Sequence, residues 1–216
     1  MLTTAFWRDM QPLGSCDVLT FWFPDLTGAD HARMVAQFRW WFGGGSDETI
    51  GTGYAALTER AARGELDGWA DAPRSRLALI IVLDQFSRSL YRNTPRAFAQ
   101  DPKALGLTLA GLENGHYAAL ETPWEKTFFF LPLGHSEYLP YQERAVTLAE
   151  ELVVSAPAKF RKILEHSASQ ARAHRDVIAR FGRHPHRNMI LGRSSTAAEV
   201  EYLATTQLVH TRLPGA

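Results

Sequence analysis

The sequence of 216 residues has little cysteine, no surplus of charge and no long apolar run, and each of these absences argues against a class of protein. Cys16 is the only cysteine, so the chain cannot form an internal disulfide, and a reducing compartment is the simpler expectation. Lysine and arginine together number 23, as do aspartate and glutamate, whereas a dedicated nucleic-acid binder needs a basic surplus for its phosphate contacts. We therefore expect no nucleic-acid partner.

Membrane insertion and export are disfavoured on similar grounds. The longest aliphatic run, residues 77–83, is far shorter than the ~20 apolar residues of a membrane-spanning helix. Residues 1–16 lack the basic start and the apolar run of a signal peptide. We expect a cytoplasmic protein with no membrane partner.

Hydrophobic residues make up 45% of the chain, enough to fill a packed core. The length fits one domain, and the best linker candidate, GGGS at 43–46, is short enough to be a loop between helices. Strand signals are weak, because alternating apolar runs bounded by tight turns are missing. We expect a single all-α domain over residues 1–216, with a core from about 16 to 208.

Proline and capping residues predict helices along most of the chain, because proline suits the first turn and glycine the position after the last. Helices with both ends predicted cover 47–63, Pro73 to about Tyr91, Asp101 to Gly115, Ser136 or Pro140 to about 154, and 157–181. Three further helices are predicted to start after Thr94, after Thr122 and after Thr196. Residues 127–133 could instead be extended, although Pro132 and the isolation of the run argue against a sheet.

The helix from Pro73 carries apolar stripes on two opposite sides, which predicts a position in the middle of the domain. Asp84 falls in one stripe, where an unpaired carboxylate is very costly, and Arg88 lies one turn further on and can pair with it. Two interpretations remain open. The pair is either a buried structural ion pair, or Asp84, Gln85 and Arg88 line a cleft.

The helix over 157–181 places Gln170 and His174 on its apolar face, where a lone histidine is more often a core residue than a catalyst. Polar residues continue beyond the helix, and between positions 172 and 193 there are six arginines and one acid. This segment leads into the helix after Thr196, whose free N–H groups favour anions. The alternative to an anion site is that these polar residues only cap the helix and that the arginines neutralise nearby acidic side chains. His135 and Glu137 form a third polar group after an aromatic run.

Four stretches carry a resemblance to a known family: LALIIVLDQFSRSLYRNTPRAFAQDPKAL at 77–105, FFLPLGHSE at 129–137, RFGRHPHRNMILGR at 180–193 and STAAEVEYL at 195–203, with FWF at 21–23 in support. Over about 18–203 the chain resembles the bacterial family called domain of unknown function 924. The resemblance implies an all-helical fold similar to tetratricopeptide-repeat superhelices, here with about eight or nine helices, and it implies no activity. Ser87, Ser89 and His184 depart from the family's pattern, which usually has proline, asparagine and an aromatic residue there.

Four functions remain open, and we favour the first, with the second next. The first is a helical binding protein with a cleft for an anionic small molecule or an acidic peptide, since arginine forks bind carboxylate and phosphate. The second is an acid–base hydrolase or lyase with His135 or His174 as the base, although no nucleophile elbow, phosphate loop or zinc-protease motif is present. The third is a metal site formed by His135, Glu137, His174 and His186, for which the spacing is a weak signal. The fourth is a scaffold with a buried ion-pair network.

We predict that the helix from Pro73 lies against residues 174–193, so that the polar groups of the two segments satisfy one another. The candidate ligand-binding residues are Asp84, Gln85, Arg88, His135, Glu137, His174, Arg183, His186, Arg187 and Asn188. No cofactor is expected, and the sequence leaves both catalysis and the oligomeric state open.

Overall fold

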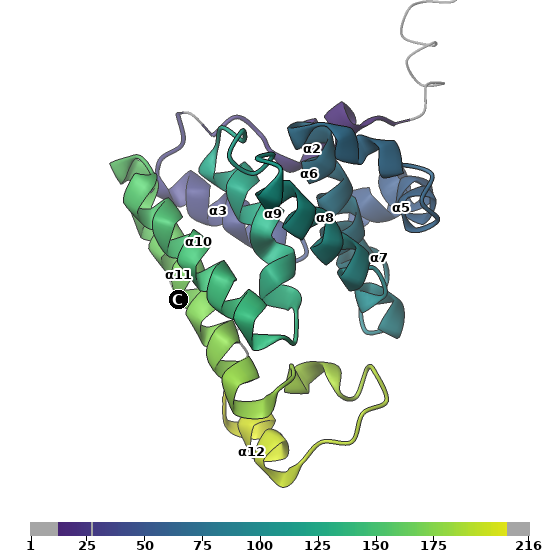
Figure 1. Ribbon diagram of the computed structural model, residues 1–216, viewed down its shortest axis with the longest axis vertical. Coiled ribbons are helices and arrows are strands. Elements are labelled where there is room, and N and C mark those ends of the chain that lie inside the picture. Colours follow the sequence, from purple (N-terminus) through teal and green to yellow (C-terminus); the bar gives the residue numbers. More distant parts are fainter. Residues whose placement is uncertain (1–12, 27, 207–216) are drawn as a thin grey trace, which may run out of the picture.

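A computed structural model describes residues 13–26 and 28–206, and all regular secondary structure in these ranges is helical (Figure 1). The helices of eight residues or more are α2 (Ser15–Trp22), α3 (His31–Phe42), α5 (Ala55–Ala62), α6 (Pro73–Ile81), α8 (Asp101–Glu113), α9 (Pro123–His135), α10 (Leu139–Ser155), α11 (Ala158–Phe181) and α12 (Ala197–Thr205). Shorter elements are α4 (Asp47–Thr49), η1 (Ile50–Tyr54), η2 (Asp67–Asp71), η3 (Val82–Phe86), α7 (Ser87–Leu90), η4 (Pro95–Phe98) and η5 (Pro185–Arg187). The all-α fold class is confirmed.

Two expectations concern residues outside these ranges. Most of the segment examined for a signal peptide, residues 1–12, lies outside the described residues, and so does the expected core limit at 208. Among the helices that are described, none is long and apolar enough to cross a membrane. The likeness to tetratricopeptide superhelices stays a prediction.

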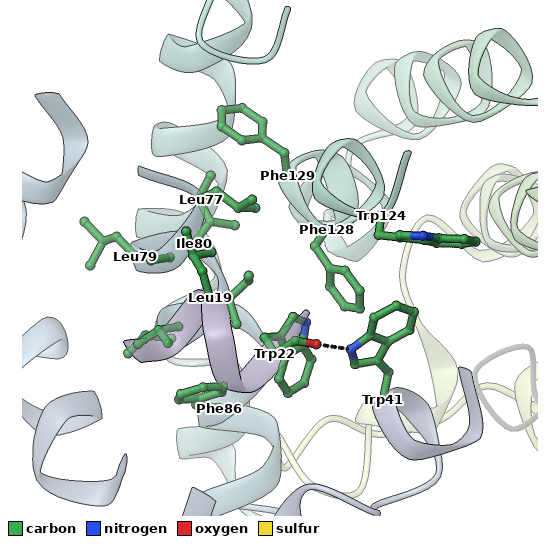
Figure 2. Packing of buried hydrophobic residues seen from close by; sticks show 14 of the residues in the cluster. Leu19, Trp22, Trp41, Leu77, Leu79, Ile80, Phe86, Trp124, Phe128 and Phe129 are labelled. Carbon is green, nitrogen blue, oxygen red and sulfur yellow. Dashed lines mark hydrogen bonds between the residues drawn. The ribbon is translucent and has the colours of Figure 1, made fainter. Parts of the chain in front are cut away.

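The helix from Pro73 lies in the main hydrophobic core of the protein. It runs without a break through α6, the π-helical turn η3 and α7, and α6 packs against α2, α8 and α9. Every side chain from 77 to 83 is fully buried, as its two apolar stripes predict. Beside it, Trp41 donates an indole N–H to the carbonyl of Trp22 at 2.8 Å, within a cluster of aromatic rings (Figure 2).

The C-terminal half forms an arm beside this core. Helices α10 and α11 pack along one another as an antiparallel pair, and α12 follows at the end of α11 (Figure 1). Gly182 ends α11 with a φ of 68°, a left-handed conformation that glycine adopts without strain. The segment between α11 and α12, residues 182–196, turns back toward the end of α9 and the start of α8.

Most helix boundaries follow the local signals. Thr122 and Thr196 each form a capping box with the glutamate three residues later. Of the two starts proposed for α10, Pro140 is near the observed one, since the helix begins at Leu139. Residues 127–133 are not extended: they lie inside α9 with Pro132 in the helix interior. Here the burial of neighbouring aromatic side chains outweighs the cost of one lost helical hydrogen bond.

Two glycines of α8 give a matched pair of substitutions. A Cβ atom on Gly111 would lie 2.3 Å from Cζ of Phe129, whereas one on Gly106 would meet no atom within 4 Å. We expect Gly111→Ala to lower the free energy of unfolding by about 1–3 kcal/mol through overpacking. Gly106→Ala should raise it by about 0.5–1 kcal/mol, because alanine has the higher helix propensity. Urea unfolding measures both, and equal effects would contradict the close packing of α8 on α9.

Candidate functional site

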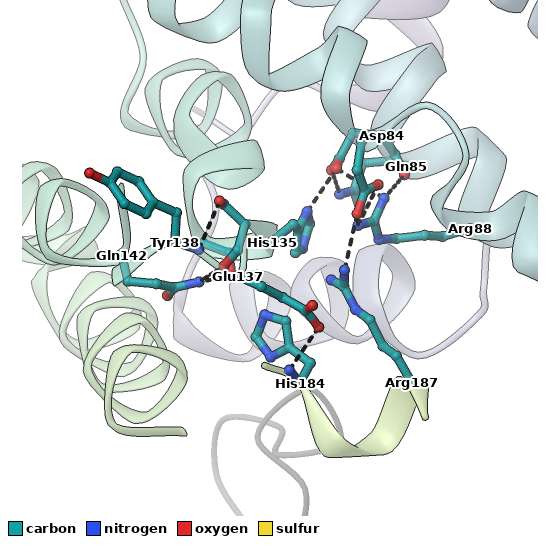
Figure 3. A network of polar contacts seen from close by, with 12 residues as sticks. Asp84, Gln85, Arg88, His135, Glu137, Tyr138, Gln142, His184 and Arg187 are labelled. Atoms are coloured by element: carbon teal, nitrogen blue, oxygen red, sulfur yellow. Dashed lines mark hydrogen bonds and ion pairs between the residues drawn. The ribbon is translucent and has the colours of Figure 1, made fainter. Parts of the chain in front are cut away.

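Asp84 is the buried centre of a polar network between η3, the end of α9 and the segment after α11 (Figure 3). Its side chain is 1% exposed. Oδ1 of Asp84 lies 2.7 Å from Nδ1 of His135 and 2.9 Å from Nη1 of Arg88, and Gln85 donates its side-chain N–H to Oδ2. Arg88 Nη1 also donates to the main-chain carbonyl of Asp84 at 2.6 Å. The carboxylate thus has a partner at each oxygen, as a buried charge requires.

A π-helical turn carries both Asp84 and Gln85. Such turns are rare inside α-helices and occur frequently at functional sites. The turn separates two ordinary α-helical segments of the same helix, so it changes the direction of these side chains without ending the helix.

The protonation states follow from these contacts. Burial opposes ionisation of Asp84, but Arg88 and His135 outweigh it and hold the pKa of Asp84 below its ordinary value. Burial and the charge of Arg88 lower the pKa of His135, although Asp84 acts in the opposite direction. His135 is therefore neutral at neutral pH.

This state fixes the tautomer of the His135 ring. An ionised carboxylate can only accept a hydrogen bond, so Nδ1 carries the proton and donates it to Asp84. The other ring nitrogen, Nε2, then bears a lone pair. It has no hydrogen-bond partner within the described part of the chain, and the side chain is 16% exposed.

Asp101 links this group to the segment after α11. Its carboxylate lies 3.0 Å from Nη2 of Arg88 and 3.2 Å from Nη1 of Arg187. The guanidinium of Arg187 also stacks on the ring of Phe98, 4.6 Å from its centroid. Burial and the neighbouring Arg88 lower the pKa of Arg187 to about 10, so the side chain is still charged at neutral pH. Its buried Nε finds no hydrogen-bond acceptor among the residues described.

Glu137 fixes the same segment at a second point. It accepts hydrogen bonds from both terminal nitrogens of Arg193, at 2.7 and 3.0 Å, and from the main-chain N–H of His184 at 2.8 Å. Burial acts against ionisation, but Arg193 and the N–H of His184 lower the pKa of Glu137 below its ordinary value. The turn after α9 is thereby attached to residues 184–193.

Two cavities adjoin His135. The inner one, of about 240 Å³, is lined in part by Gln85, Arg88, His135, His174, His186 and Arg187. The outer one, of about 400 Å³, is lined in part by Phe98, Asp101, His135, Glu137, Arg187 and Leu191. Both are bordered by His135 and Arg187, so a small molecule in either would lie beside these two side chains.

The structure brings together eight of the ten candidate residues. Asp84 contacts His135, Glu137 lines the outer cavity, and the other six line the inner cavity: Gln85, Arg88, His135, His174, His186 and Arg187. Arg183 and Asn188 point elsewhere. Arg183 forms two hydrogen bonds with Glu199, at 2.6 and 2.7 Å, and Asn188 donates to Ser195 Oγ at 3.1 Å. These contacts hold α12 and its preceding loop.

The expected anion site at the start of α12 holds a side chain of the protein itself. Glu199 accepts the N–H of Thr196 at 2.7 Å, so a carboxylate already caps this N-terminus. The arginines among the candidates are likewise paired: Arg88, Arg183 and Arg187 each contact a carboxylate. The site is therefore close to neutral and not a strongly basic groove.

Three contributing residues escape prediction from the sequence. Asp101 precedes a proline, a pattern that indicates only a helix cap, and Phe98 lies in a short 3-10 helix without a pattern. His184 is 2% exposed and lines the inner cavity next to His174 and His186, with ring centroids 5.7 and 5.4 Å away. Only its departure from the family pattern marks it. Within the described ranges, no group of three or more His, Cys, Asp or Glu side chains is placed to hold a metal ion.

Comparisons with known proteins agree with the helical fold. A family model described as "Bacterial protein of unknown function (DUF924)" matches residues 18–207. The chain is also similar to the solved structure of a protein of unknown function from Agrobacterium tumefaciens, with 34% identity and a TM-score of 0.66, covering 84% of this chain and 100% of the other. A comparison with curated proteins finds no match.

The two buried histidines predict how stability depends on pH. Burial lowers the pKa of both His135 and His184, the latter also through Arg187, so both stay neutral in the folded state. In the unfolded chain they take up protons below about pH 6.5, which favours unfolding as the pH falls. We expect the free energy of unfolding to decrease between pH 6.5 and 5 by up to about 1.4 kcal/mol per unit for each histidine.

The variant His184→Phe tests this assignment, since an aromatic residue fits the buried position without a titrating group. It should remove about half of the pH dependence contributed by the pair. The control is His31→Phe in the exposed first turn of α3, which should leave the slope unchanged. Urea unfolding at several pH values measures all three proteins. An unchanged slope in His184→Phe would contradict the neutral state of His184.

Proposed function

Because the chain belongs to the DUF924 family of bacterial proteins, for which no reaction is established, we propose a function from the site itself: an acid–base enzyme, a hydrolase or lyase, that acts on a small anionic substrate. His135 is the base, Asp84 orients it, and Arg187 holds the substrate's anionic group.

The Asp84–His135 pair is the observation that carries this proposal. A base must be neutral, correctly oriented and within reach of the proton that it removes. The 2.7 Å contact with Asp84 orients the ring and keeps the proton on Nδ1, so the lone pair of Nε2 is available at the cavities. After Nε2 takes a proton, from a water molecule or from a substrate carbon, the buried carboxylate stabilises the imidazolium.

Arg187 supplies the second element that such a reaction requires. Its guanidinium is charged, is held against Phe98 and Asp101, and borders both cavities with His135. A carboxylate or phosphate group in this position could accept a hydrogen bond from Nε. The same charge would stabilise negative charge that develops while His135 removes a proton.

A binding protein for the same kind of anion, or for the carboxylate of an acidic peptide, is the second candidate. It is favoured by the buried Nε of Arg187, which could hold such a group without any reaction. A purely structural ion-pair network explains Asp84, Arg88 and Asp101 equally well. It gives no role to the cavities or to the free nitrogen of His135.

His135→Gln tests the catalytic proposal. The probes are panels of small anionic esters, amides and phosphate esters for hydrolysis, and of β-hydroxy carboxylates for elimination, with products followed by NMR. For a substrate that the wild type converts, we expect the substitution to lower kcat by about 10²–10⁴, the usual contribution of a general base. Asp84→Asn should also lower kcat, because an amide in place of the carboxylate no longer fixes the ring's tautomer. His174→Gln separates the two histidines considered as bases, and the exposed His31→Gln is the control.

The pH dependence gives a further readout. Since the lowered pKa keeps His135 deprotonated, activity should persist below pH 6.5 and fall only in more acidic solutions. Unchanged turnover in His135→Gln would contradict the role of this residue. Binding of anions with no turnover in either panel would favour the binding protein.

We place this protein in the cytoplasm. The proposal rests on the single cysteine, Cys16, because a chain that cannot form an internal disulfide suits a reducing compartment. Fractionation of cells that express the native protein should recover it with cytoplasmic markers. Recovery mainly from the periplasm or from membranes would contradict this location.

A further inference from the structure

A third cavity lies beside His135, between α3, α9, α10 and α11. Its volume is about 110 Å³. Most of its wall is hydrocarbon, contributed by Phe38, Phe42, Phe130, Leu131, Ala145 and Ala171. We call it the apolar chamber.

The apolar chamber adjoins the inner, more polar cavity. Phe42, His135 and His174 line both spaces, so His135 lies at the boundary between them. A molecule that contacts the ring of His135 from the polar side therefore has an apolar recess next to it. The guanidinium of Arg187 borders the polar cavity and does not line the chamber.

We propose that the apolar chamber binds a short hydrocarbon chain of the substrate, whose anionic group lies at Arg187. This inference rests on the proposed function for the position of the anion. It adds the substrate class: a small carboxylate or phosphate with an unbranched chain of about four or five carbons. In this arrangement the substrate passes His135, with its charged end in the polar cavity and its apolar end in the chamber.

The chamber's size limits the chain. An apolar cavity of about 150 Å³ accommodates benzene, with six carbons, and is dry when empty. By proportion, 110 Å³ holds a chain of about four or five carbons. A longer chain would extend beyond this volume, so its additional carbons would gain less burial.

Hydrocarbon burial gives this proposal a quantitative signature. Each methylene moved from water into an apolar site contributes about 0.8 kcal/mol, which corresponds to about a fourfold gain in affinity. Affinity should rise about fourfold for each carbon from acetate to butyrate or pentanoate. It should stop rising, or fall, at octanoate. A flat polar surface would give no such limit.

The experiment is a titration of the full chain with acetate, butyrate, pentanoate and octanoate, followed by NMR of alanine and leucine methyl groups. Butyl phosphate and inorganic phosphate form a second pair that tests the other anionic group. We expect butyrate to shift the methyl signals of Ala145, Ala171 and Leu131, and acetate to leave them nearly unchanged. Equal affinity for acetate and pentanoate, or methyl shifts elsewhere, would overturn the proposal.

Two variants of α11 sharpen the test. Ala171→Leu fills the chamber and should abolish the gain in affinity per carbon while acetate still binds. Ala179→Leu makes the same change further along the same helix, at an exposed position outside the chamber wall, and should keep the full chain-length dependence. If Ala171→Leu fails to fold, the chain-length series of the wild type still decides the question.

The outcomes separate this inference from the proposed function. Chain-length-dependent binding with no turnover in any panel would support the chamber and contradict the enzyme. Turnover that depends on His135, with no preference among the alkanoates and no methyl shifts, would support the enzyme and contradict the chamber. Binding of none of the anions would contradict both the chamber and the anion site at Arg187.

Discussion

The ionised carboxylate of Asp84, almost completely removed from water, is the constraint on which the rest of the site depends. Taking such a charge into a protein interior is tolerable only when its partners are fixed in place. Arg88 lies one turn away on the same helix, but His135 comes from the end of another, 51 residues later in the chain. The helices α6 and α9 must therefore keep their relative position, which the fully buried stretch over 77–83 ensures.

The helical scaffold could be predicted largely from the sequence, because helix ends depend on local contacts. Thr122, Thr196 and Gly182 each act within a few residues of themselves, and the structure has the expected cap at all three. Residues 127–133 are an exception, because their sequence pattern does not distinguish a helix from an extended segment. They are helical in the structure, where their aromatic side chains are buried on several sides. No local signal could show that.

The candidate site could be predicted in part, and the limits have physical causes. Helical periodicity predicts that an acid such as Asp84 faces inward. Because an unpaired buried carboxylate costs much free energy, partners for it are also predicted nearby. Which arginine pairs with which acid depends on distant contacts, such as that between Asp101 and Arg187, 86 residues apart. The π-helical turn over 82–86 also has no signal in the sequence, since it reflects what the surrounding packing requires of Asp84 and Gln85.

The attachment of residues 184–193 gives the site a sensitivity to ionic strength that the core does not share. This segment forms one side of the cavities, and two ion pairs attach it, one through Glu137 and one through Asp101. The side chains of Glu137 and Arg193 are 29% and 24% exposed, so dissolved ions can screen their attraction. The ion pair of Asp84 and Arg88 is screened less, because the side chain of Asp84 is only 1% exposed. Concentrated salt would thus loosen this side of the cavities while the hydrocarbon core, which gains from salting-out, holds its shape.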